Sequence, residues 1–280
     1  MQKGTSMPES EHSTLGTSSI HRLLAEAGLP NIAHAPVRTL RVESLEKRYG
    51  ETVALTNANV TFGHGVHTIL GENGSGKSTM LKILSGVVAP THGRVVLDDH
   101  TVSGKSPADM KALGLATVFQ EVLIAPHRSV VENIFLGFDG LVTRKVSKSG
   151  RETAADAVLS KIARFPIDLH AAAGGLSLAA QQLVVIARAL INRPSILLLD
   201  EATAALDYAD RDLVFEAIED YAASGNIVIF ISHRLEEVKR LSDKVTVLRS
   251  GHVVDTLDRQ QINSQILLRL MAPEAHLDVE

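Results

Sequence analysis

The sequence predicts an α/β protein built around a mainly parallel β-sheet that is buried on both faces. Short runs rich in Val, Ile and Leu alternate along the chain with segments whose apolar residues recur at helical spacing, which is typical of parallel strands covered by helices. The chain has 280 residues, of which 45% are hydrophobic, enough for one large core. The expected strands comprise residues 66–70, 116–119, 196–199, 227–231 and 245–248.

Helices and a second sheet are expected between and before these strands. Three helical stripes are formed by Met80, Ile83, Leu84 and Val87, by Leu183, Ile186, Ala187 and Leu190, and by Val214, Ala217, Ile218 and Tyr221. Apolar residues alternate around residues 40–62 and 93–103, which predicts a smaller antiparallel sheet. The region 128–190 reads as mainly helical, so we expect a helical subdomain over about residues 125–180.

The N-terminal segment differs in composition from the domain expected over residues 39–272. Residues 1–18 are rich in Ser, Thr, Glu and His, which predicts disorder within a tail of residues 1–38. A short amphipathic helix interrupts this tail, and we expect it to dock on its own domain. Its apolar residues are Ile20, Leu23, Leu24 and Ala27, with Gly28 and Pro30 as the stop. Residues 30–36 read as a linker and residues 273–280 as a C-terminal tail.

Composition excludes several classes of protein. A net charge of −4 gives no electrostatic attraction to nucleic acid. The absence of cysteine excludes disulfides and thiolate metal sites. No run approaches the ~20 apolar residues that span a bilayer, and the N-terminus lacks the apolar core of a secretory signal. We therefore expect any work at a membrane to depend on a partner.

The strongest motif is a glycine-rich loop at residues 71–79, between an expected strand and an expected helix. Gly71-Glu-Asn-Gly-Ser-Gly-Lys-Ser-Thr79 fits the P-loop pattern G-x-x-x-x-G-K-[ST]. Glycines let successive N–H groups point at phosphate oxygens, and the helix that follows adds its positive end. Lys77 is expected to reach the β- and γ-phosphates and Ser78 to bind Mg²⁺. The predicted nucleotide-binding residues are Gly71, Glu72, Asn73, Gly74, Ser75, Gly76, Lys77, Ser78 and Thr79.

Two acids, Asp200 and Glu201, follow the apolar run 196–199. A buried strand has no structural need for paired carboxylates at its end, although either acid alone could be an ordinary surface residue. We expect Asp200 to hold Mg²⁺ and Glu201 to activate the attacking water as a general base.

With these two motifs, the chain resembles the ATP-binding cassette (ABC) ATPases over roughly residues 39–272. The resemblance implies a P-loop NTPase fold with a parallel RecA-like sheet, and ATP and Mg²⁺ as ligands. It also implies roles for four further residues. Gln120 matches a glutamine that touches Mg²⁺ and water and senses the membrane partner, and His233 matches a histidine that contacts the γ-phosphate. Tyr49 matches an aromatic residue that stacks on adenine, and Asp207 matches a loop that crosses the dimer interface.

The signature motif departs from the family pattern. The usual Leu-Ser-Gly-Gly-Gln is here Leu176-Ser-Leu-Ala-Ala180, followed by two glutamines. The resemblance implies that the signature acts on nucleotide held by the other subunit, through Ser177, Leu178, Ala179, Ala180 and Gln181. Ala179 replaces a glycine, which narrows the allowed backbone and predicts slower or partner-assisted catalysis. Ala202 stands where the family usually has proline, and we read residues 144–151, with Arg144, Lys145, Lys148 and Arg151, as a solvated loop.

Within the family, the segments Val118-Phe-Gln-Glu121 and Ile231-Ser-His-Arg-Leu-Glu-Glu237 look like those of cassettes that power sugar import. This implies a peripheral protein on the cytoplasmic face of the cell membrane. Its implied partners are a second ATPase subunit, giving a homodimer, a membrane permease and, indirectly, a substrate-binding protein. Chromosome-organising ATPases would carry a coiled coil before Ser177, and translation factors a second cassette. A weakly catalytic regulatory subunit stays open because of Ala179.

Overall fold

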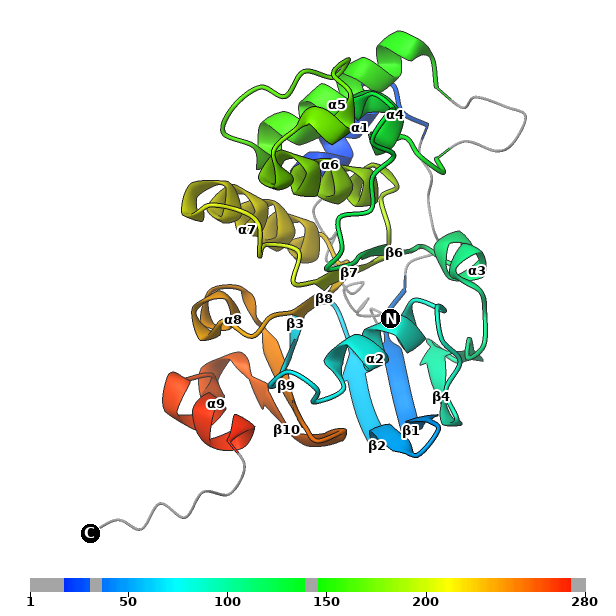
Figure 1. Ribbon diagram of the computed structural model, residues 1–280, viewed down its shortest axis with the longest axis vertical. Helices are drawn as coiled ribbons and strands as arrows, with labels where there is room; N and C mark the ends of the chain where they lie inside the picture. The colour runs from blue at the N-terminus through cyan, green and yellow to red at the C-terminus, as the bar shows by residue number, and fades with distance from the viewer. Residues whose placement is uncertain (1–17, 31–36, 139–145, 273–280) are drawn as a thin grey trace, which may run out of the picture.

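The computed structural model describes residues 18–30, 37–138 and 146–272 and contains the expected parallel sheet (Figure 1). Its strands run in the order β10-β9-β3-β8-β7-β6, and all neighbours are parallel except β9 and β10. The strands are β3 (Gly65–Leu70), β6 (Leu115–Val118), β7 (Ile196–Asp200), β8 (Ile227–Ile231), β9 (Lys244–Arg249) and β10 (His252–Asp258). The antiparallel β10 was not predicted. It follows a two-residue turn in which Ser250 and Gly251 both have positive φ, as hairpin turns require.

Each central strand divides its side chains between two cores. Ile196 and Leu198 of β7 face one core, whereas Leu197 and Leu199 face the other. This alternation follows from the pleat of a strand, in which neighbouring side chains point to opposite faces. The continuous apolar runs of the sequence therefore reflect burial on both faces, as expected.

One face of the sheet is covered by helix α2 (Lys77–Leu84) and by a second, antiparallel sheet. That sheet has the order β2-β1-β4-β5, and its presence confirms the prediction from residues 40–62 and 93–103. The strands are β1 (Leu40–Tyr49), β2 (Thr52–Phe62), β4 (His92–Leu97) and β5 (His100–Thr101). Helix α2 ends earlier than predicted, so Val87 lies beyond it and is 49% exposed.

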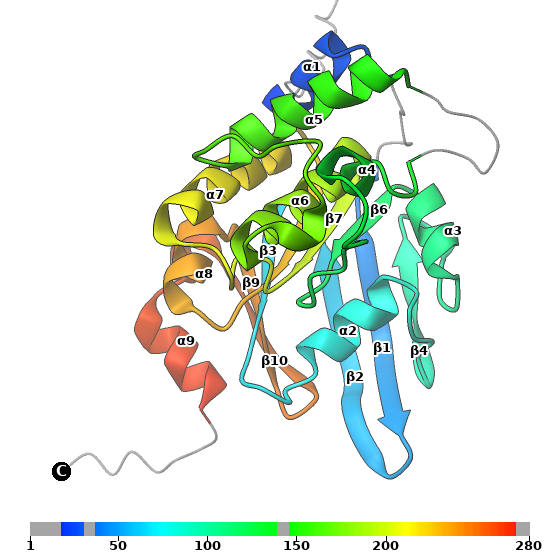
Figure 2. The same ribbon diagram turned by 45° about the horizontal axis from the view of Figure 1, so that its top comes forward.

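The other face is covered by α6 (Leu178–Ile191) and α7 (Tyr208–Ala223), with α4 (Val130–Ile134) and α5 (Lys148–Ile162) farther from the sheet (Figures 1 and 2). The remaining helices are α3 (Pro107–Ala112), α8 (Leu235–Leu241) and α9 (Ser264–Met271), and the two 3₁₀ turns are η1 (Ala173–Gly175) and η2 (Arg259–Gln261). None of the helices in the described ranges is both long enough and apolar enough to span a bilayer.

The prediction of a loop at residues 144–151 is wrong for the C-terminal part of this range. Lys148 and Arg151 lie in the first turn of α5, whose N-cap is Ser147. The Ser147 hydroxyl accepts a hydrogen bond from the Gly150 N–H, so the serine that suggested a loop instead begins a helix. Arg144 and Lys145 fall outside the described residues.

The N-terminal helix α1 (Ser19–Glu26) docks on its own domain, as predicted. Ile20 and Leu24 are fully buried, and α1 packs against α5 and α7 (Figure 2). Both the backbone N–H and the hydroxyl of Ser19 donate to Asp220 Oδ2 of α7 at 2.8 Å. Ser18, assigned to the disordered segment, instead caps α1; the rest of that segment, linker residues 31–36 and tail residues 273–280 are outside the described residues.

Candidate functional site

The candidate site lies at the carboxyl ends of the parallel strands. The glycine-rich loop follows β3, Gln120 comes after β6, Glu201 after β7 and His233 after β8. Because these strands are parallel neighbours, their carboxyl ends lie at the same edge of the sheet, which is where ligands bind in open α/β folds. The topology thus brings together residues that are far apart in the sequence.

At its last residue, Gly76, the loop of residues 71–76 has a backbone conformation that favours glycine. Gly76 has φ +107° and is the N-cap of α2. A Cβ atom there would lie 2.6 Å from the Ala54 carbonyl oxygen and 2.8 Å from Leu55 Cδ2. Ser75 Oγ is buried and has no hydrogen-bond partner within the described residues. An unpartnered buried hydroxyl in a loop of N–H groups fits a phosphate group.

Lys77, the first residue of α2, is held against this loop. Its Nζ donates to the carbonyl oxygens of Gly71 and Glu72, both at 2.8 Å. Burial lowers the pKa of Lys77, while the charges of Glu201 and Asp200 act in the opposite direction. A buried ammonium group is thereby fixed beside the loop.

Asp200 is the last residue of β7 and is 5% exposed. Burial raises the pKa of its carboxyl group, and the neighbouring Glu201 charge adds to this effect, whereas Lys77 opposes it. The nearby hydroxyl of Ser78 also acts to lower the pKa of Asp200. A carboxylate and a hydroxyl in contact are hard oxygen ligands of the kind that Mg²⁺ takes, so this pair fits the predicted metal.

Glu201 is the meeting point of three loops. Its Oε1 lies 3.0 Å from His233 Nδ1, and its Oε2 accepts from Gln120 Nε2 at 3.4 Å. Its backbone has φ +47°, which is unusual for a glutamate, and its N–H donates to the Ile231 carbonyl oxygen at 3.0 Å. The backbone of the neighbouring strand β8 thus holds the left-handed turn that presents this carboxylate.

The signature residues lie apart from this cluster. Ser177 is the N-cap of α6, and its hydroxyl accepts from the Ala180 N–H at 3.2 Å. Leu178 is 60% exposed, and Gln181 Nε2 donates to the Leu176 carbonyl oxygen at 2.9 Å. Throughout the described ranges, no hydrogen bond joins Ser177 to residues 71–79.

Ala179 lies in the first turn of α6 and is not among the residues with positive φ. The narrower backbone range of alanine is compatible with the conformation at this position, and the effect of Ala179 on catalysis stays a prediction. In a helix, alanine is more favourable than glycine by about 1 kcal/mol.

Two further predicted residues sit on exposed ends of elements. Asp207 is the N-cap of α7, where its Oδ1 accepts from the Asp210 N–H at 2.8 Å. Tyr49 ends β1 and is 47% exposed, and the Lys47 ammonium group lies 5.0 Å from the centre of its ring. Neither side chain is buried, so Asp207 and Tyr49 are both accessible to a ligand or to a second chain.

Residues around α8 were missed by the sequence prediction. Glu237 is 3% exposed and contacts Thr203, Ser232 and Arg234. A signal for it exists in the sequence, because Glu237 shares the buried face of α8 with Val238 and Leu241. A carboxylate on an apolar helix face must find donors, since burying it unpaired is costly.

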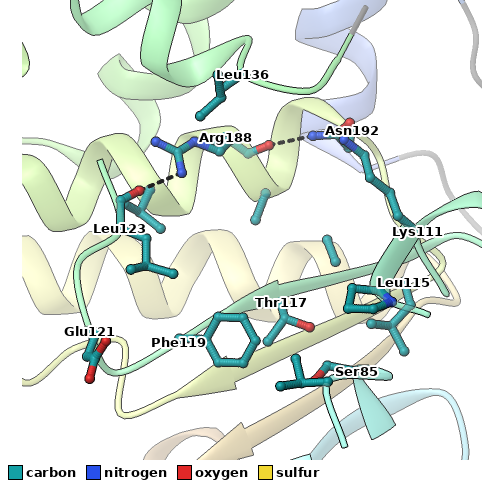
Figure 3. Close-up of a pocket in the computed structure, with 15 residues that line it drawn as sticks. Ser85, Lys111, Leu115, Thr117, Phe119, Glu121, Leu123, Leu136, Arg188 and Asn192 are labelled. Carbon is teal, nitrogen blue, oxygen red and sulfur yellow. Dashed lines mark hydrogen bonds between the residues drawn. The ribbon is translucent and has the colours of Figure 1, made fainter. Parts of the chain in front are cut away.

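A hollow of about 240 Å³ lies between β6 and α6, and its lining includes Phe119 and Glu121, the chain neighbours of Gln120 (Figure 3). Leu123 and Leu136 at its border are 53% and 46% exposed. Arg188 of α6 crosses its wall, where its Nη1 donates to the Leu123 carbonyl oxygen and its Nε to the Asn133 carbonyl oxygen, both at 2.7 Å. We call this feature the β6–α6 groove.

Comparison with known proteins gives one consistent family. The profile of the ABC transporter family matches residues 55–204. Ribose import ATP-binding protein RbsA 1 of Rhizobium johnstonii is 36% identical over 245 residues, which is 87% of this chain and 48% of that protein. RbsA of Yersinia pestis is 38% identical over 240 residues, 84% of this chain and 46% of that protein. The chain therefore spans about half the length of these curated relatives.

Solved structures share the fold. The dimeric structure of MJ0796, a bacterial ABC transporter cassette, superposes with a TM-score of 0.72 at 26% identity and covers 79% of this chain and 98% of that one. A bacterial Atm1-family ABC exporter with ATP bound gives a TM-score of 0.70 at 25% identity, covering 88% of this chain and 44% of that one.

Proposed function

This chain belongs to the ABC transporter family, and on that premise we propose that it is an ATP-hydrolysing subunit that powers sugar import through a membrane permease. The observation that carries the proposal is the Glu201 carboxylate, which lies between Gln120 and His233 at the sheet edge that also bears the P-loop. The names of the relatives, which are ribose import ATP-binding proteins, support sugar as the transported class. The catalytic domain corresponds to residues 39–272, with its helical subdomain at about 125–180.

The P-loop residues 71–79 hold the nucleotide in this proposal. Backbone N–H groups and the free Ser75 hydroxyl meet the phosphates, and Lys77 exchanges its carbonyl contacts for phosphate oxygens. Ser78 and Asp200, with Gln120, hold Mg²⁺. When bound, ATP with Mg²⁺ supplies the terminal phosphoryl group and the metal that neutralises its charge. Tyr49 stacks on the adenine ring.

Glu201 acts as the general base. A carboxylate at hydrogen-bond distance from His233 and Gln120 is fixed in orientation, as proton transfer from a water molecule requires. His233 also contacts the terminal phosphate. The pair therefore links proton removal to the position of the phosphoryl group.

A second copy of the chain completes the site. Ser177, Leu178, Ala179, Ala180 and Gln181 form the signature surface that faces the partner's nucleotide, and Asp207 lies in the interface. Exposure of Leu178 and the lack of a bond from Ser177 to its own P-loop support this arrangement. The dimeric state of the MJ0796 cassette supports it further. Nucleotide that binds the closed dimer better shifts the population toward it, and hydrolysis reverses the shift.

The β6–α6 groove is the docking surface for the permease. Its lining includes both chain neighbours of Gln120, and its border exposes Leu123 and Leu136 to a partner (Figure 3). A permease held there places this chain on the cytoplasmic face of the membrane as a peripheral subunit. A substrate-binding protein acts on the other side through the permease, and nucleic acid has no part.

The test is affinity purification of the tagged full chain from detergent-solubilised membranes, with Leu123→Arg and the control Leu268→Arg. Leu123 and Leu268 are 53% and 54% exposed, but Leu268 lies on α9, away from the groove. A polytopic permease should be recovered with wild type and Leu268→Arg and lost with Leu123→Arg, while all three bind ATP. Failure of wild type to recover any permease would refute the transport role.

A further inference from the structure

The buried carboxylate of Glu237 lies in the first turn of α8, the helix that begins two residues after His233. Its Oε2 accepts from the Ser232 hydroxyl at 2.6 Å. Its Oε1 accepts from Thr203 Oγ1 at 3.2 Å and from Arg234 Nη1 at 3.3 Å. Both carboxylate oxygens therefore accept hydrogen bonds, from Thr203 and Ser232, which precede α8, and from Arg234, its N-cap.

These contacts fix both chain neighbours of His233. Ser232 is held through its hydroxyl, and this same oxygen also accepts from the Arg234 N–H at 3.0 Å. Arg234 is held a second time through its guanidinium group. The His233 side chain is itself half exposed, so its position beside Glu201 depends on the two residues that flank it.

The same carboxylate also reaches the Glu201 side of the pair. Thr203 lies two residues after Glu201, in the turn that follows β7, and is 1% exposed. Arg211 of α7 adds an ion pair, with its Nη1 3.6 Å from Glu237 Oε1. Glu237 thus joins the Glu201 turn, the His233 loop and the first turns of α7, whose N-cap is the predicted interface residue Asp207.

We propose that Glu237 is a positioning residue that sets the distance between His233 and Glu201. The proposal rests on the hydrolytic function proposed above and deepens it. Glu237 touches neither member of the pair and acts through Ser232, Arg234 and Thr203.

The Glu237→Gln variant tests this with little change of shape. A carboxamide keeps one acceptor oxygen and gains an NH₂ group. Guanidinium groups cannot accept a hydrogen bond, so the amide oxygen must face Arg234, which turns the NH₂ group toward Ser232. The Ser232 hydroxyl then has to reverse its role although it already accepts from the Arg234 N–H. The loop that carries His233 should shift.

The matched control is Glu236→Gln. Glu236 is the neighbouring acid in the first turn of α8, is exposed, and makes no hydrogen bond or ion pair in the described part of the chain. Both variants remove one negative charge from the same helix end, so any effect of the helix dipole is common to both.

The measurement is kcat and KM for ATP with the full chain, in wild-type and His233→Ala backgrounds. Glu237→Gln should lower kcat about 10- to 100-fold, the size expected for a displaced catalytic group, with KM within about twofold. In the His233→Ala background the same change should cost less than about twofold, because contacts that act through one residue are not additive. An equal loss in both backgrounds, or a kcat like that of Glu236→Gln, overturns the proposal.

A second readout separates this proposal from the hydrolytic function. The imidazole ¹H–¹⁵N resonances of His233 should move in Glu237→Gln and stay in place in Glu236→Gln. If wild type hydrolyses no ATP, the hydrolytic function fails, and these resonances alone decide the positioning role. Unchanged resonances in Glu237→Gln would overturn it.

Discussion

Replacing Glu201 by glutamine should stop ATP hydrolysis and leave nucleotide binding intact. Lys77 and Ser78, which we propose hold the phosphates and the metal, make their contacts with Gly71, Glu72 and Asp200. The substitution also removes one of the charges that raise the pKa of Asp200, so this carboxyl group ionises at least as readily as before. Binding of the nucleotide should therefore be equal or slightly stronger.

The size of the kinetic effect follows from the role of the carboxylate. A positioned general base contributes about 10²- to 10⁴-fold to a rate. Each factor of ten corresponds to about 1.4 kcal/mol, so the barrier should rise by about 3–5 kcal/mol. Glutamine can still offer one oxygen to His233 at the present 3.0 Å, so the loss should come from missing proton transfer and not from a displaced loop.

The assay combines phosphate release with size-exclusion chromatography in ATP and Mg²⁺. The variant should elute as a dimer, because nucleotide joins the two chains and is not cleaved. Wild type should elute mainly as a monomer, because hydrolysis of the ATP makes its dimer short-lived. Glu216→Gln, an exposed acid of α7, serves as the control and should behave like wild type. A Glu201→Gln protein that stays monomeric and hydrolyses ATP at the normal rate would refute the composite site.

Three further predictions concern stability and the altered signature. Ala179→Gly should lower the free energy of unfolding by about 0.5–1 kcal/mol, because glycine weakens a helix. The rate of phosphate release should equal or exceed that of wild type. A marked fall in this rate would contradict the expectation that alanine at this position slows catalysis. Leu24→Ala should cost about 3 kcal/mol in urea unfolding, since it empties a fully buried position; an unchanged midpoint would mean that α1 unfolds separately. Burial lowers the pKa of His67 from 6.5 to about 4. The folded state therefore loses about 3 kcal/mol of its free energy of unfolding as the pH falls from about 6.5 to about 4, because the unfolded chain takes up the proton first. Urea unfolding of His67→Gln should show a much weaker pH dependence over the same range, and equal slopes would refute the assignment.

Elements buried on both faces were the most predictable from sequence. The bounds of β8 agree with the prediction, and those of β3 and β7 differ by one residue. The apolar runs of β7 and β8 are continuous and end at polar residues, and every residue of β3 after Gly65 is buried. Strand β10 was missed because Leu257 is its one buried residue, so its sequence shows no alternation of apolar and polar residues. The start of α5 was missed because its serines and glycine resemble a loop until their hydrogen bonds are seen.

The candidate site divides in the same way. A P-loop is a contiguous motif, so its residues could be read directly. The contacts of Glu201 with Gln120 and His233 join residues 81 and 32 positions apart and depend on strand order, which no local pattern contains. The effect of Ala179 on catalysis stays a prediction, because the structure shows only that this residue has an ordinary helical backbone.

The pairing of β7 with β6 and β8 has a consequence for how this protein can vary. Asp200 is the last residue of β7, and neighbouring residues of a strand point to opposite sides. Loss or gain of one residue within β7 would move the residue at the end of the strand by about 3.3 Å and turn its side chain to the other side. Exchanges among Ile, Leu and Val in this strand should therefore be tolerated in a mutational library, whereas single-residue deletions and insertions should be eliminated by selection for activity.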